Sequence, residues 1–202
     1  SVNGKRKRIA LKYHKKGKRL LEWASSSLIY SDGSFAQHSV VYHRIMLDTF
    51  SVCEIWRKYF DLPKFSEKLI NKVQKATDWM FWFTDTISGD APNIGGNDGA
   101  HVFNLGLDEY RDFRPSVQLA SMHFHDECYY PQGKWDEQLK WLSDARLVLK
   151  YNPKQKASKL FPQGGYYIHV SEPPDLYWFM FRLPYYKDRP AHSDAMHFDL
   201  WS

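Results

Sequence analysis

The feature that most constrains the fold of this 202-residue chain is a change in its hydrophobic period near residue 150. Before that point apolar residues recur at helical spacing, which predicts helices at 5–30, 35–60, 66–87, 114–125 and 134–144. Ser66 is the expected N-cap of the third helix. The pattern therefore predicts that the first 150 residues are mainly helical.

After residue 150 short alternating segments replace the helical pattern. They predict strands at 166–170, 176–183 and 195–201, with turn residues between the first two. Helices that come first and antiparallel strands that come last indicate an α+β fold that is mainly α. We therefore expect a helical portion at 1–150 and a β portion at 151–202.

A long glycine- and proline-rich segment at 88–113 interrupts the helices. A loop of this length is either functional or disordered. Its apolar members, among them Ile94, Val102 and Phe103, favour packed order.

Charge and aromatic content suggest an anionic partner. The formal net charge is +5 and aromatic residues make up 17% of the chain. Many of the cations lie near the N-terminus, at Lys5, Arg6, Lys7, Arg8, Lys12, Lys15, Lys16, Lys18 and Arg19. Such a surface attracts nucleic acid, anionic lipid or acidic polysaccharide, although a solvated helix face is the simpler interpretation. No nucleic-acid-binding motif is found, so we expect no nucleic-acid partner.

Several other features bound the class of protein. No apolar run is long enough for a membrane span, and Cys53 and Cys128 form no CxxC pair that would indicate a redox compartment. The chain shows no initiator Met or signal peptide, and its alternation continues up to Ser202. We therefore expect a chain cut inside a strand, whose unpaired C-terminal edge promotes self-association.

Three segments, in the same order along the chain, resemble the heparinase II/III-like polysaccharide lyases. They are Asp32–Arg44, then Asn97–Ala100 with Tyr110–Ser116, and finally Arg189–His197. The resemblance covers a middle portion of a typical member. It implies part of an incomplete α/α toroid at 1–150, followed at 151–202 by the first strands of an antiparallel β-sandwich.

The resemblance also implies β-elimination at uronic acid residues of acidic polysaccharides. That reaction needs a base, a neutraliser of the uronate carboxylate and an acid for the leaving oxygen. Tyr42 matches the family's catalytic tyrosine, and His38 is expected on the same helical face four residues earlier. His192 is the third catalytic candidate. Pro190 stands where some members have a substrate-facing histidine, so His192 aligns better with their metal-binding one.

Four further residues are candidates for substrate binding. Asn97, Asp98 and His101 either line a sugar cleft or, for the first two, form turns. Arg114 either meets substrate carboxylates or pairs with a neighbouring aspartate. We expect no cofactor; His192 alone makes no metal site, and a structural zinc is expected only in a longer chain.

One expected element of the family site has no match here. The family's upstream Asn-His pair, which neutralises the carboxylate, is not found, and His14 has no Asn before it. An alternative function is therefore non-catalytic binding of acidic glycan through the basic and aromatic surface. The polysaccharide is not identified by the sequence, and a periplasmic or secreted location is implied only by the resemblance.

Overall fold

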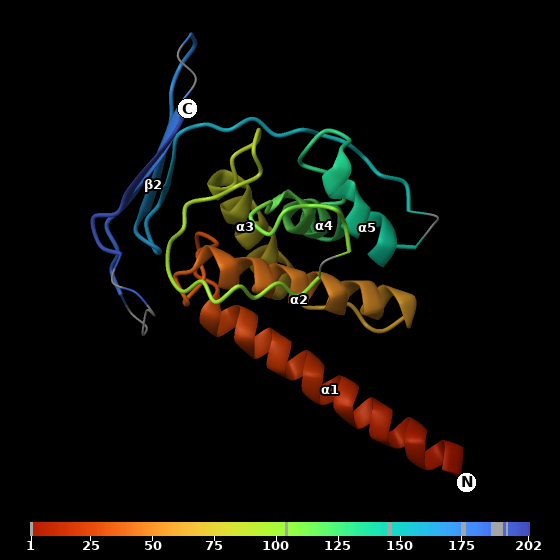
Figure 1. Ribbon diagram of the computed structural model, residues 1–202. Helices are drawn as coiled ribbons and strands as arrows, with labels where there is room; N and C mark the ends of the chain where they lie inside the picture. Colours follow the sequence, from red (N-terminus) through yellow and green to blue (C-terminus); the bar gives the residue numbers. More distant parts are fainter. Residues whose placement is uncertain (1, 104, 145–146, 175–176, 187–191, 193) are drawn as a thin grey trace.

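The computed structural model shows an α+β fold in which helices precede a four-stranded antiparallel sheet (Figure 1). The structure describes residues 2–103, 105–144, 147–174, 177–186, 192 and 194–202, and side chains from residue 8 onward within these ranges. The predicted succession of helices and strands is confirmed at this level. The segment that follows α5 crosses above the helices to reach the sheet.

The helices form a layer from which one member projects. Helices α2 (Val40–Tyr59), α3 (Glu67–Phe83) and α4 (Arg114–Phe124) pack on one another. A 3-10 turn, η1 (Lys134–Asp136), leads into the short α5 (Glu137–Leu142) beside α4. The C-terminal part of the long α1 (Val2–Leu28) contacts α3, and the rest of α1 extends away from the body (Figure 1).

Side-chain caps determine where two helices begin. Ser66 caps α3 as predicted, because its Oγ accepts a hydrogen bond from the backbone N–H of Leu69 at 3.1 Å. Ser39 caps α2 in the same way, so this helix begins at Val40 and the predicted start at residue 35 is wrong. Helix α3 ends before residue 87, because the Asp85 carboxylate accepts hydrogen bonds from the next turn and stabilises a loop instead.

The sheet is a meander in the order β1 (Lys159–Phe161), β2 (Tyr166–Val170), β3 (Trp178–Arg182) and β4 (Phe198–Trp201). Strand β2 matches the prediction residue for residue, while β3 and β4 fall inside the predicted segments. Strand β1 was not predicted, since three residues are too few to show a period. Residue 176, the expected first residue of the strand predicted at 176–183, lies outside the described residues.

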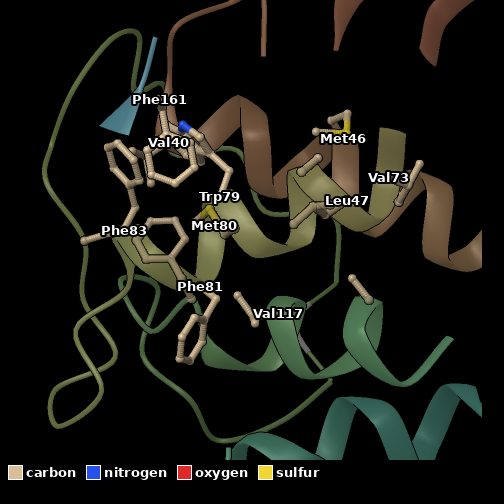
Figure 2. Close-up of a cluster of buried hydrophobic side chains, with 14 of the residues drawn as sticks. Val40, Met46, Leu47, Val73, Trp79, Met80, Phe81, Phe83, Val117 and Phe161 are labelled. Carbon is tan, nitrogen blue, oxygen red and sulfur yellow. The ribbon is translucent and has the colours of Figure 1, made fainter. Parts of the chain in front are cut away.

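The sheet and the helices share one hydrophobic core (Figure 2). Alternation in β2 and β3 turns Ile168 and Met180 to the same buried face, where they pair across the strands. At the junction Trp79 of α3 stacks on Phe83 with ring centroids 3.7 Å apart and meets Phe161 of β1 edge-on at 6.4 Å. The helical portion and the β portion are thus held against each other by aromatic packing.

Candidate functional site

The site begins at the N-terminus of α2, where Tyr42 meets the 88–113 loop. The Ser39 hydroxyl accepts from the Tyr42 backbone N–H at 3.1 Å and donates to the carbonyl of Gly96 at 2.6 Å. One side chain therefore caps the helix and ties it to the loop. The partly exposed Tyr42 hydroxyl donates to the Asp98 carboxylate at 2.8 Å.

The loop side of this contact is a network of polar side chains. The Tyr110 hydroxyl donates to Asn97 Oδ1 at 2.7 Å, and Asp98 Oδ1 accepts from the Ala100 backbone N–H at 3.1 Å. The Asn97 and Asp98 side chains thus accept turn hydrogen bonds from the backbone two residues later, and Asp98 also contacts Tyr42. We call Tyr42, Asn97, Asp98 and Tyr110 the Tyr42 cluster.

A buried arginine fixes the loop to the helix. The Arg44 guanidinium donates to the carbonyls of Tyr110 at 2.5 Å and Ala100 at 3.1 Å. It also lies 4.7 Å from the ring centroids of both Tyr110 and Phe113, within range for cation–π attraction. Because Arg44 is on the same helix as Tyr42, it sets the position of the loop relative to the tyrosine.

The electrostatics of the Tyr42–Asp98 pair favour one protonation state. The hydrogen bond to Asp98, followed by the charge of that carboxylate, raises the pKa of Tyr42 above its usual value. The same hydrogen bond, together with that from the Ala100 N–H, lowers the pKa of Asp98. At neutral pH the pair is therefore a protonated phenol beside an ionised carboxylate. This is the state required of a general acid rather than of a tyrosinate base.

His38 does not share a helical face with Tyr42, which corrects the sequence-based expectation. It precedes the N-cap, has a left-handed backbone φ of 51°, and its imidazole is buried. The centroid of its ring is 6.0 Å from that of Tyr30 and 5.5 Å from that of Tyr186. Capping by Ser39 is the physical reason, since it ends helical geometry before His38 is reached.

The third segment of the resemblance meets the same loop. Asp194 accepts hydrogen bonds from the Gly95 N–H at 2.8 Å and from the buried Arg182 at 2.9 Å. His192, two residues earlier, is exposed. Arg189–Ala191 and Ser193 lie outside the described residues. The segments that are far apart in the sequence thus converge around residues 95–98.

His101 and Arg114 occupy contrasting environments. His101 is partly buried with its ring 6.1 Å from that of Tyr110, and burial followed by the charge of Arg44 lowers its pKa. Arg114 is buried and pairs with Asp112 through two hydrogen bonds of 2.9 and 2.7 Å. It also donates to backbone carbonyls of the preceding loop. The structure therefore shows the alternative in which Arg114 pairs within the protein.

Two other residues that could have met a substrate carboxylate, Arg111 and His14, have surroundings away from Tyr42. Arg111 donates to Asp90 at 2.6 Å and to Asn93 at 3.2 Å. His14 lines a hollow with Leu62, beyond the C-terminal end of α2, whereas Tyr42 lies in the first turn of that helix. Sequence reasoning did not identify Ser39, Arg44 or Tyr110, although Ser39 and Arg44 flank Tyr42 in the segment that carries the resemblance.

Neither a metal cluster nor a membrane span is found among the described residues. Within them no three His, Cys, Asp or Glu side chains come together as ligands, and no helix is both long and apolar enough to cross a bilayer. Comparison with known proteins found no matching family model, no matching curated protein and no matching solved structure.

Proposed function

We propose that this chain is a heparinase II/III-like polysaccharide lyase that cleaves uronic-acid-containing polysaccharide by β-elimination. In this proposal α1 to α5 are part of an incomplete α/α toroid, and β1 to β4 begin a β-sandwich. The observation that supports it most is the partly exposed Tyr42 hydroxyl, which donates to Asp98 at 2.8 Å. Two segments of the resemblance meet in that contact.

Tyr42 acts as the general acid. Asp98 keeps the proton on the phenol until the glycosidic oxygen of the substrate replaces the carboxylate as its acceptor. The departing alkoxide is more basic than phenolate, so proton transfer to it is downhill. His192 is the candidate base, since it is exposed and Asp194 connects its segment to the loop that carries Asp98. Asn97 and His101 contact the sugar beside the scissile bond.

Binding of acidic glycan without cleavage is the second candidate. A hollow of about 950 Å³ at the other end of α2 is lined by Trp56, Tyr59 and Phe60 together with aliphatic and polar residues. All three aromatic side chains are exposed, an arrangement that suits stacking on sugar rings. The engagement of Arg44 and Arg111 within the protein also favours this function, because neither guanidinium is directed at a substrate carboxylate.

One experiment separates the two functions. The chain is incubated with alginate, heparin and hyaluronan, and the ultraviolet absorbance of the conjugated uronate formed on elimination is followed alongside binding by calorimetry. Absorbance that grows with one polysaccharide supports the lyase. Binding with no growth in absorbance supports the glycan-binding function, and neither signal on any of the three contradicts both. Sedimentation velocity tests the accompanying proposal of self-association through β4, where Phe198 and Leu200 are exposed.

A further inference from the structure

The net positive charge of the chain comes from helix α1. Nine of the 28 Lys and Arg residues and one of the 23 Asp and Glu residues lie in Val2–Leu28. The helix therefore has a formal charge of +8, and the rest of the chain has −3. This cationic helix extends away from a weakly acidic body (Figure 1).

The single carboxylate of α1 faces the body. Glu22 accepts hydrogen bonds from the backbone N–H and the hydroxyl of Ser66 at the start of α3. On the same side Leu21 packs against the main core and Ser25 is buried. The opposite side of the helix consequently has no acidic residue.

That opposite side presents an apolar stripe to solvent. Ile9, Tyr13, Leu20 and Trp23 are 44%, 68%, 50% and 62% exposed. Their spacings of four, seven and three residues place them along one side of a helix. The exposed cations Lys12, Lys16 and Arg19 run beside the stripe at the same kind of spacing.

We propose that α1 binds the surface of an anionic lipid bilayer, with its apolar stripe inserted among the headgroups and its cations on lipid phosphates. An interfacial helix combines basic residues with Trp, Tyr and Leu on an adjacent face, as this helix does. A dissolved acidic polysaccharide would use the cations and the aromatic rings of Tyr13 and Trp23, but it would leave the aliphatic Ile9 and Leu20 in water. A purely apolar protein surface would cover the stripe and leave the cations unpaired. The bilayer matches both features and is independent of the proposed lyase activity.

The test is co-sedimentation of the chain with phosphatidylcholine vesicles, with and without about one quarter phosphatidylglycerol. We expect binding to rise at least about tenfold with the anionic lipid and to fall as salt is added. Tryptophan emission should shift to the blue on binding, and this shift should be smaller in Trp23→Phe. Replacing Lys12, Lys16 and Arg19 by Gln should weaken binding about 100-fold, at roughly fivefold per cation.

Matched variants define the result that would overturn the inference. Gln at the exposed Lys68, Lys140 and Lys150, which lie outside α1, removes the same charge and should change binding less than about twofold. The pair Leu20→Ser and Trp23→Ser should weaken binding about tenfold or more while the melting temperature is retained. Equal losses of binding in the two sets of Gln variants, or no preference for anionic vesicles, would refute a lipid-binding α1. So would binding of heparin by α1 without binding of vesicles, or a dimer that buries Trp23.

Discussion

Tyr42 and His43 are adjacent in α2 and lie in opposite environments. Tyr42 is partly exposed and donates a hydrogen bond to Asp98 at the surface. His43 is fully buried, stacks on Trp79 at 4.3 Å and donates from Nε2 to the carbonyl of Ala76 at 2.8 Å. Burial lowers the pKa of His43 from 6.5 to about 3, whereas the hydrogen bond from Tyr42 to Asp98 raises that of the tyrosine.

The difference separates polar groups that maintain the fold from those that are open to solvent. His43, Arg44 and Arg114 bond to fixed backbone or side-chain partners inside the protein. Their loss should affect stability. The Tyr42 cluster depends on these buried contacts for its geometry, but its own groups reach solvent. Changes there should leave stability almost unchanged and, if the proposed lyase function is correct, should affect proton transfer to the substrate.

The largest effect is expected at the buried ion pair of Arg114 and Asp112. Arg114→Met leaves the carboxylate buried without its partner, which should lower the free energy of unfolding by about 3–5 kcal/mol. Arg111→Met breaks a half-exposed pair with Asp90 and should cost less than about 1 kcal/mol. Urea unfolding of both variants measures the difference, and equal losses would contradict the distinction between the two pairs.

The next effect concerns the packing of the loop against the start of α2. Gly95 and Gly99 both have positive φ, of 71° and 76°. A Cβ on Gly95 would lie 2.3 Å from the carbonyl oxygen of His38, while one on Gly99 would meet nothing within 4 Å. Gly95→Ala should therefore cost about 3 kcal/mol and Gly99→Ala about 1 kcal/mol, the latter from backbone strain alone. Thermal melts of the two variants test this, and a Gly95→Ala melt like that of Gly99→Ala would show that the loop is not held at this point.

A smaller effect is expected from acid. His43 binds a proton more readily in the unfolded chain, so its contribution to stability is complete above pH 6.5 and is lost as the pH falls toward about 3. Between about pH 7 and pH 5 the free energy of unfolding should fall by about 2 kcal/mol because of His43. His43→Phe should be less stable at neutral pH, since the Ala76 carbonyl loses its donor, but its stability should fall less on acidification. The control His192→Phe removes an exposed imidazole and should lose as much stability on acidification as the wild type. If His43→Phe also lost that much stability, His43 could not be the buried neutral group described above.

The smallest change in stability is expected at the surface pair. Asp98→Asn removes the charge beside the phenol, so the pKa of Tyr42 should move down toward its usual value. Because the pair is exposed, the melting temperature should stay close to that of the wild type. Titration of the tyrosine ring by NMR follows the pKa, and an upward movement or no movement would show that Asp98 does not control this phenol.

Much of the fold is predictable from the sequence because it depends on local pattern. The stripe of α3 and its Ser66 cap, the glycine-rich loop and the alternation of β2 are all set by neighbouring residues. The start of α2 was misjudged because the apolar pattern continues through Phe35, and the cap at Ser39 overrides it.

Candidate site residues could be named from the sequence, but the contacts between them could not. Tyr42 and Asp98 were both candidates, yet their hydrogen bond joins positions 56 residues apart. The contacts of Arg44 with Ala100 and Tyr110 span 56 and 66 residues. Helical spacing had paired Tyr42 with His38 instead. Contacts between a helix and a distant loop are set by tertiary packing, which cannot be inferred from the spacing of apolar residues along the sequence.

The central claim, that Tyr42 donates the proton in eliminative cleavage, is tested most directly by the rate at which unsaturated product forms in Tyr42→Phe. On a polysaccharide that the wild-type chain cleaves, we predict a loss of about 100- to 10,000-fold with an unchanged melting temperature. Tyr167→Phe, which removes the hydroxyl of an exposed tyrosine on β2, should retain the wild-type rate. A Tyr42→Phe chain that cleaves as fast as wild type would contradict the assignment.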